Sequence, residues 1–294
     1  MTDNPLIREL LAEGTVLSDG AWGTELQKRG LRAGETPDFL NLSHPERVEA
    51  VARAYVDAGS RVVLTNTFRA NRIALAQHPE VDRVAEVNRA GVEISRRAAD
   101  GRACVFASMG PSGKLLLTGK VSEAQLHEAF DEQARAHAEA GADAIVVETM
   151  TDLAEAKIAI EAAKATGLPV VASMVFDSGK QRDRTMMGVS PEQAAEELTR
   201  FGANVVGANC GTGIEKFVAI CASMATATHL PIWVKANAGL PEFDRGDVVY
   251  PSDSGHFAGH LPALLDAGAG FVGGCCGTSP EYIAALRGEL NRLR

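Results

Sequence analysis

Short apolar runs alternate along this chain with longer segments whose apolar residues recur at helical spacing. The runs are almost continuously apolar, which is typical of parallel strands buried on both faces. They predict eight strands, at 15–17, 61–65, 104–108, 144–147, 169–176, 204–208, 231–236 and 270–273. The periodic segments predict eight helices, at 45–58, 81–99, 122–140, 153–165, 190–201, 214–227, 254–267 and 279–292.

Several of the predicted helices have recognisable end signals. Ser190 and Ser279 each precede a proline, so a hydroxyl cap stands before a first-turn proline. Gly141 and Gly202 follow two other helices, where glycine commonly ends a helix. Eight strand–helix alternations predict a (β/α)8 TIM barrel, with a doubly wound open sheet as the competing fold. We expect one domain over 1–294, because no linker-like or low-complexity stretch interrupts the pattern.

Composition narrows the class of function. The formal net charge is -9 and the sequence pI is near 5.3, so no basic face is offered to nucleic acid or an anionic membrane. The first residues carry charges and lack an apolar signal core, and no run approaches the roughly 20 apolar residues of a membrane span. Five cysteines, two of them adjacent, do not suit a disulfide framework. We therefore expect a cytoplasmic protein with reduced thiols.

Chemically useful residues follow the predicted strands at their C-terminal ends, where barrels keep their active sites. Seven of the eight ends carry a group that can bind a metal or hydrogen-bond a substrate. In chain order, the residues at these ends are Asp19, Asn66, Ser108, Glu148, Phe176, Cys210, Asn237 and the pair Cys275-Cys276. Turns also favour Asn, Asp and Ser, but three thiols and two carboxylates at one rim predict a functional site.

Three of the cysteines predict a metal site. Cys275 and Cys276 are adjacent within a glycine-rich run, and Cys210 follows an earlier predicted strand. Three thiolates with a fourth position left open form a zinc arrangement suited to catalysis. Cys104 and Cys221 lie in apolar runs, and we interpret them as core residues.

The chain resembles the homocysteine S-methyltransferases. This family includes the homocysteine-binding module of cobalamin-dependent methionine synthase and the methyltransferases that use betaine or S-methylmethionine. The matching motifs are DGAWGT at 19–24, TNTF at 65–68, GP at 110–111, ET at 148–149, GANC at 207–210, NAGLP at 237–241 and GGCCGT at 273–278. They span nearly the whole chain, and the double cysteine paired with Cys210 is the most specific of them.

The resemblance implies methyl transfer to the thiol of homocysteine through a zinc-bound homocysteine thiolate, giving methionine, with no further catalytic group. It implies zinc as the cofactor, with Cys210, Cys275 and Cys276 as its ligands. Asp19 and Glu148 are the candidates for holding the substrate ammonium group. The other candidate substrate contacts are the backbone amides near Gly20 and Ala21, the region of Ser108, Thr67, and, as further candidates, Asn66, Asn209 and Asn237.

The methyl donor stays open at this stage. A quaternary ammonium donor usually needs an aromatic cage, and the betaine-using relatives place aromatic residues where this chain has 67–71 and 148–150. This chain has Phe68 but no tyrosine there, which argues against betaine as in the animal enzymes. S-methylmethionine remains a candidate. So does a methyl-corrinoid or methylfolate carried by a partner protein, because 294 residues leave no room for domains that bind them.

Other interpretations remain open. Lys235 lies within a predicted strand, where a lysine can be the Schiff-base nucleophile of an aldolase or can simply pair with an acidic neighbour. A non-catalytic thiol- or zinc-binding barrel subunit is a second class, and selenohomocysteine or selenocysteine is an alternative acceptor. His256 and His260 have helical metal-ligand spacing but lack the acid of a zinc protease motif, so we expect them to face solvent.

Overall fold

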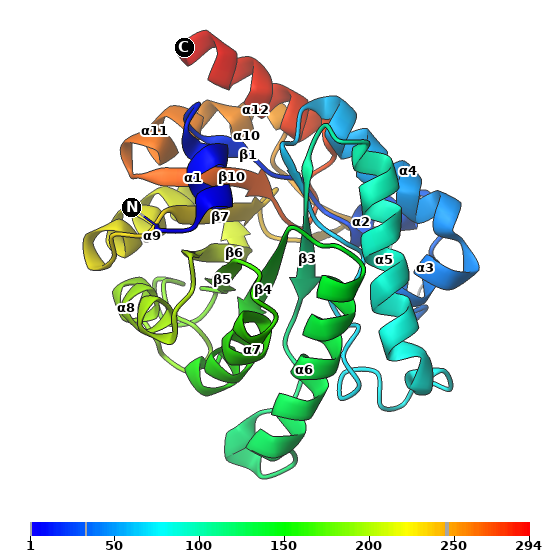
Figure 1. Ribbon diagram of the computed structural model, residues 1–294. Coiled ribbons are helices and arrows are strands. Elements are labelled where there is room, and N and C mark those ends of the chain that lie inside the picture. The colour runs from blue at the N-terminus through cyan, green and yellow to red at the C-terminus, as the bar shows by residue number, and fades with distance from the viewer. Residues whose placement is uncertain (1, 33, 245–246) are drawn as a thin grey trace.

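The structure, a computed structural model, describes residues 2–32, 34–244 and 247–294. Eight parallel strands form one sheet in the order β1-β10-β7-β6-β5-β4-β3-β2, with helices around the outside (Figure 1). The strands are β1 (Val16–Leu17), β2 (Val62–Val63), β3 (Cys104–Met109), β4 (Ala144–Met150), β5 (Val170–Met174), β6 (Val205–Gly213), β7 (Ile232–Asn237) and β10 (Ala269–Gly274). The predicted TIM barrel is confirmed.

The first and last strands of this order, β1 and β2, meet through isolated hydrogen bonds. Among the described residues, no ladder pairing joins them. The Arg61 amide donates to the Leu17 carbonyl over 2.8 Å, and the Leu64 amide donates to Oδ2 of Asp19 over 2.8 Å. Between β1 and β2, where the barrel is nearly closed, a side-chain carboxylate therefore accepts a hydrogen bond that a backbone carbonyl would accept in a regular sheet. We call this junction of β1 and β2 the barrel seam.

The helices connect successive strands. Ser190 caps its helix as the sequence predicts, whereas the side chain of Ser279 forms no capping hydrogen bond to α12 among the described residues. Ser122 and Ser190 each form a reciprocal capping box with the glutamine three residues later. No helix in the described part of the chain is long and apolar enough to cross a membrane. The helices are α1 (Pro5–Leu11), α2 (Gly23–Lys28), α3 (Leu40–Ser43), α4 (Pro45–Ala58), α5 (Val84–Ala99), α6 (Glu123–Glu139), α7 (Leu153–Ala165), α8 (Pro191–Phe201), α9 (Ile214–Ala227), α10 (Ser254–Gly259), α11 (Leu261–Asp266) and α12 (Pro280–Leu293).

Some elements differ from the prediction. The helix expected at 254–267 is two helices, α10 and α11, which meet at His260. Pro262 lies in the first turn of α11, and because it has no amide hydrogen it cannot continue the hydrogen-bond ladder of α10. A short antiparallel pair, β8 (Glu242–Asp244) and β9 (Asp247–Val249), and the N-terminal helix α1 were not predicted. These short additions lack the long periodic pattern that marks the barrel elements.

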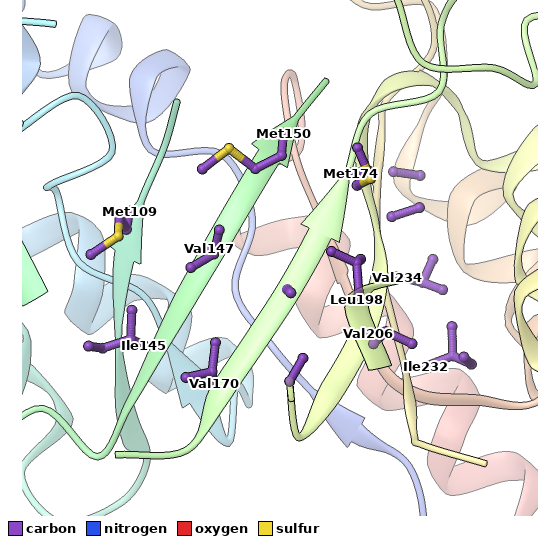
Figure 2. Packing of buried hydrophobic residues seen from close by; sticks show 14 of the residues in the cluster. Met109, Ile145, Val147, Met150, Val170, Met174, Leu198, Val206, Ile232 and Val234 are labelled. Carbon is purple, nitrogen blue, oxygen red and sulfur yellow. The ribbon is translucent and has the colours of Figure 1, made fainter. Parts of the chain in front are cut away.

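Successive strand residues point to opposite sides of the barrel wall. Ile145 and Val147 on β4 pack in the layer between strands and helices, part of which Figure 2 shows. Ala144 and Val146 belong to a separate cluster with Trp233, which fills the barrel interior. The two apolar layers explain why the strands read as continuous hydrophobic runs.

The inward register carries polar residues to the mouth of the barrel. Glu148 lies two residues beyond the inward-facing Val146 on β4. Lys235 and Asn237 follow the inward-facing Trp233 on β7 at the same spacing. Because side chains alternate along a strand, the residues that fill the core lower down also determine which polar groups face the mouth.

We predict that Gly207→Ala strongly destabilises the barrel. A Cβ atom at Gly207 would lie 2.0 Å from the carbonyl oxygen of Trp233 on the neighbouring strand, and backbone cannot move aside as a flexible side chain can. Overpacking of this kind should lower the free energy of unfolding by about 3 kcal/mol or more in urea titrations.

The matched control is Gly288→Ala on α12, where a Cβ would meet nothing within 4 Å. Alanine is the better helix former by about 0.5–1 kcal/mol, so this variant should be neutral or slightly more stable. Equal effects of the two substitutions would contradict the close approach of β6 and β7.

Candidate active site

Three sulfur atoms converge at the C-terminal end of the barrel. Cys210 lies in the last part of β6, and Cys275 and Cys276 follow β10 directly. Their Sγ atoms all lie within 4.8 Å of one another, and those of Cys210 and Cys276 are 3.8 Å apart. Tetrahedral zinc with Zn–S bonds of about 2.3 Å separates its sulfur ligands by about 3.8 Å. The donor set and its spacing therefore fit a thiolate zinc site.

Irregular backbone turns these cysteines toward each other. The pairing of β6 with β7 shifts register between Asn209 and Gly213, and Cys210 has φ of 63°, in the left-handed region. Such a conformation costs on the order of 1–3 kcal/mol in a residue with a side chain, and it occurs mainly where function requires it. On the other side, the Cys276 amide donates to Oδ1 of Asn237 over 3.1 Å. Asn237 thus positions the backbone of one cysteine from the end of β7.

The three thiols do not ionise independently. Hydrogen bonds from the thiols of Cys275 and Cys276 lower the pKa of Cys210, and donating such a bond to Cys210 raises the pKa of Cys275. In contrast, burial raises the pKa of Cys104 to about 11 and that of Cys221 to about 12. These two thiols therefore stay protonated, and Cys221 lies in the apolar core as expected.

A cavity of about 510 Å³ opens beside the thiols, a size that suits a small molecule. It contains all three cysteines together with several of the predicted site residues. Its lining consists of Gly20, Ala21, Trp22, Gly23, Thr24, Gln27, Pro37, Asp38, Leu64, Thr65, Asn66, Phe68, Arg69, Ser108, Glu148, Thr149, Cys210, Lys235, Tyr250, Gly274, Cys275 and Cys276.

Glu148 presents a buried carboxylate to this cavity. The residue is 7% exposed, its carboxylate accepts a hydrogen bond from the Ser108 hydroxyl, and its Oε2 lies 3.5 Å from Nδ2 of Asn209. Burial raises the pKa of Glu148, and the Lys235 cation and the Ser108 hydrogen bond partly offset that effect. The carboxylate therefore lacks a full complement of positive charge around it.

Asn209 links the Glu148 strand to the cysteine strand. Its Oδ1 accepts from the Thr149 amide over 2.8 Å and from the Ser173 hydroxyl, and its Nδ2 donates to the Thr149 hydroxyl over 2.7 Å. Thr149 has φ of 62°, so β4, like β6, has left-handed backbone at the site. Asn209 accordingly determines the relative positions of Glu148 and its own neighbour Cys210.

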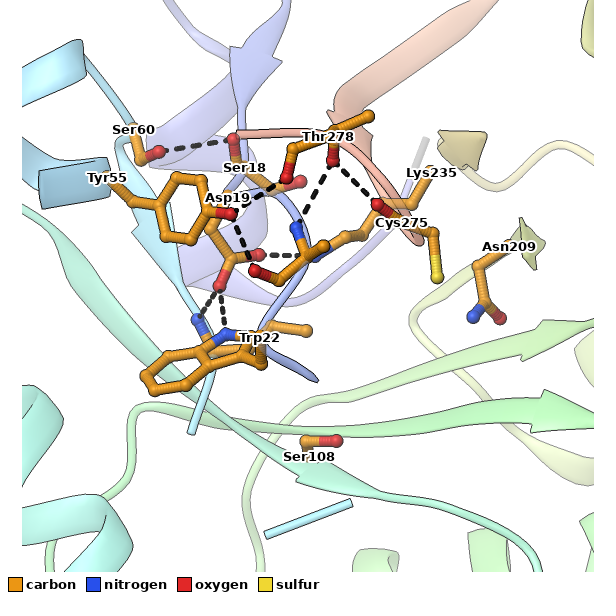
Figure 3. A network of polar contacts seen from close by, with 12 residues as sticks. Ser18, Asp19, Trp22, Tyr55, Ser60, Ser108, Asn209, Lys235, Cys275 and Thr278 are labelled. Carbon is orange, nitrogen blue, oxygen red and sulfur yellow. Dashed lines mark hydrogen bonds and ion pairs between the residues drawn. The ribbon is translucent and has the colours of Figure 1, made fainter. Parts of the chain in front are cut away.

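Asp19 is fully buried and is not among the residues that line the cavity. Figure 3 shows its carboxylate bonded to the Trp22 indole, at 2.8 Å, and paired with the Lys235 ammonium group. Together with the Leu64 amide at the barrel seam, these partners occupy both carboxylate oxygens. The alternative that Lys235 pairs with an acidic neighbour is confirmed, and direct contact of Asp19 with substrate stays a prediction.

The other predicted contacts fall into two groups. Gly20, Ala21, Asn66 and Ser108 line the cavity, although the Ala21 amide already donates to the Thr278 carbonyl over 3.1 Å. Thr67 does not line it; its hydroxyl donates to the Ser108 carbonyl over 2.7 Å and so supports the cavity wall. Substrate binding by these residues remains a prediction.

Three residues that line the cavity were not predicted from the sequence as site residues: Tyr250, Trp22 and Asp38. Tyr250 follows β9, and its ring packs where a Cβ at Gly277 would lie, 2.2–2.7 Å from the ring atoms. Trp22 and Asp38 also line the cavity, and burial raises the pKa of Asp38 to about 6. Trp22 lies within the DGAWGT motif, which was a signal for it. Tyr250 lies in a loop and Asp38 in the short 3-10 helix Pro37–Phe39, and neither segment has a distinctive sequence pattern.

These features define a TIM barrel with a cluster of three thiols, spaced as metal ligands are, beside a cavity of small-molecule size. A family model described as homocysteine S-methyltransferase matches residues 16–290. The chain belongs to the homocysteine S-methyltransferase family.

Named relatives agree with this assignment. The methionine synthase of Mycobacterium tuberculosis is 30% identical over 97% of this chain, which spans only 25% of that protein. Betaine–homocysteine S-methyltransferase 1 of Rattus norvegicus is 30% identical over 97% of this chain and 74% of its own length. Among solved structures, the metallated form of the homocysteine methyltransferase MmuM from Escherichia coli has a TM-score of 0.80 and 25% identity, covering 97% of this chain and 99% of that one.

Proposed function

We propose that this protein transfers a methyl group to the thiol of homocysteine, forming methionine, with zinc held by Cys210, Cys275 and Cys276. The observation that carries the proposal is the buried carboxylate of Glu148, which forms no ion pair within the described part of the chain and lies in the same cavity as the three thiols. An amino acid with a side-chain thiol offers both partners: an ammonium group for the carboxylate and a sulfur for the metal.

The charges in the site support an ammonium ligand. Asp19 and Lys235 form a buried ion pair, so their charges offset each other. Among the residues that the structure describes, Glu148 then remains as a carboxylate without a paired cation, and an unpaired buried charge is unfavourable. A substrate ammonium group next to Glu148 would remove this penalty, which makes the site selective for an amino acid over a simple thiol.

When bound, zinc supplies a Lewis acid that lowers the pKa of a coordinating thiol, so that it is a thiolate at neutral pH. The homocysteine sulfur then attacks the methyl carbon of the donor in line, forming the S–CH3 bond of methionine. The bond between the methyl carbon and the donor breaks, and its electron pair leaves with the donor. Ser108 and Asn209 orient the Glu148 carboxylate, which holds the ammonium group of the substrate. The substrate sulfur is thereby held in one orientation relative to the donor methyl group.

The cavity lining bears on the methyl donor. Trp22, Phe68 and Tyr250 place three aromatic side chains around the space beside the thiols. Aromatic faces attract sulfonium and quaternary ammonium groups, so a small cationic donor such as S-methylmethionine fits this lining. This chain spans 25% of the methionine synthase of Mycobacterium tuberculosis, and a methyl-corrinoid or methylfolate carried by a partner protein stays a second candidate donor.

A donor panel tests the proposed reaction. The zinc-loaded chain is incubated with homocysteine and, in turn, S-methylmethionine, S-adenosylmethionine, betaine, methylcobalamin and methyltetrahydrofolate, and methionine is quantified. We expect methionine from at least one donor, no product from Cys276→Ser, and full activity from Cys221→Ser, whose thiol is buried in the core. Homocysteine binding without product from any donor would favour the non-catalytic barrel instead.

Glu148→Gln should raise the KM for homocysteine about 100-fold and change kcat less. Glutamine keeps a hydrogen-bonding partner for Ser108 but removes the charge that pairs with the ammonium group, and loss of one partner of a buried charge pair costs about 2–5 kcal/mol. Steady-state kinetics with homocysteine as the varied substrate measures the effect.

Glu155→Gln is the matched control. Glu155, on α7, is another buried carboxylate with a pKa raised by burial, but it accepts from the Ser112 amide and does not line the cavity. Its KM for homocysteine should stay near that of the wild type. An unchanged KM in Glu148→Gln, or the same rise in both variants, would remove Glu148 from the substrate site.

A further inference from the structure

A second group of metal-type ligands lies apart from the cysteines. One ligand atom each from Glu215, His256 and His260 lie within 4.8 Å of one another. Nε2 of His256 is 2.5 Å from Oε1 of Glu215, and the two imidazole rings meet edge to face with centroids 4.8 Å apart. The acid that is missing from the local sequence pattern is therefore supplied by another helix, α9.

Local structure explains this convergence. His256 and His260 are four residues apart at α10, so they lie on one face of the helix. Asp253 caps the helix by accepting from the His256 amide over 2.8 Å, which orients the first turn. On the other side, a Cβ at Gly213 would lie 2.5 Å from Oε2 of Glu215. The Glu215 carboxylate therefore packs against Gly213 at the start of α9, where a side chain at 213 would displace it.

The donor chemistry suits a divalent transition metal. Nδ1 of His260 lies 3.0 Å from the carbonyl oxygen of His256, and donation by Nδ1 leaves the lone pair on Nε2. Fixing the tautomer through such a backbone hydrogen bond is common for metal-binding histidines. Two imidazoles and one carboxylate are a ligand set for zinc and for neighbouring divalent ions. The His256 and Glu215 side chains are 47% and 51% exposed, so water can complete the coordination.

We propose that Glu215, His256 and His260 bind a divalent transition-metal ion such as zinc at a site separate from the three cysteines. The ion would join α9, which follows the Cys210 strand, to α10, which follows the segment that carries Tyr250. The ion would therefore restrict the relative motion of the Cys210 strand and the Tyr250 segment, both of which contribute residues to the cavity. The inference does not depend on the proposed methyl transfer.

Cobalt titration distinguishes the two sites. Co²⁺ is added to the metal-free, tag-free full chain, and absorption is recorded with the bound stoichiometry. A thiolate site gives an intense sulfur-to-cobalt charge-transfer band, whereas a site of nitrogen and oxygen ligands does not. We expect two bound ions per chain, one with this band and one without it. His260→Ala and His256→Gln should each lower the affinity for the second ion at least about tenfold and leave the charge-transfer band unchanged.

His127→Ala is the matched control, because His127 also pairs on the surface with a glutamate, Glu161, at 3.6 Å but has no third ligand beside it within the described ranges. This variant should still bind two ions. Uptake of only the ion that gives the band, or a second ion unaffected by both His256→Gln and His260→Ala, would overturn the proposal and leave an ordinary surface ion pair. A missing charge-transfer band with an intact second ion would instead count against the cysteine site and the proposed function.

Discussion

The site depends on holding three sulfur atoms from two distant parts of the chain close together. In the sheet, β7 lies between β6 and β10, so the two cysteine-bearing segments approach each other across the end of β7. Asn237, at that end, fixes the Cys276 amide, and the left-handed backbone at Cys210 turns its thiol toward the same point. Three thiolates this close repel one another, and a shared divalent cation removes that repulsion.

The buried ion pair of Asp19 and Lys235 lies next to the same site. Asp19 joins the barrel seam at Leu64, the Trp22 indole and the Lys235 ammonium group, so one carboxylate serves closure and charge balance together. Because Lys235 is already paired, Glu148 is left to interact with an incoming cation. In the proposed reaction, this carboxylate would contact the amino group of the substrate and the three cysteines would hold the metal that binds its sulfur, and the fixed strands between them would give specificity.

Much of this could be predicted from the sequence because the strands follow simple physical rules. Continuous apolar runs indicated the barrel, and strand ends indicated Glu148, Ser108 and the cysteines. Partners that depend on tertiary packing could not be inferred. The Asp19–Lys235 pair joins residues 216 positions apart, and Tyr250 reaches the cavity from a loop. The break in the helix at 254–267 was missed although Pro262 marks it, because the apolar pattern continues through that position.

Zinc K-edge X-ray absorption of the full chain, loaded with one equivalent of zinc, tests the central claim most directly. We predict three sulfur ligands at about 2.3 Å with one lighter ligand. Addition of homocysteine should replace the lighter ligand with a fourth sulfur. A shell with fewer than three sulfur atoms, or one that homocysteine leaves unchanged, would contradict the account.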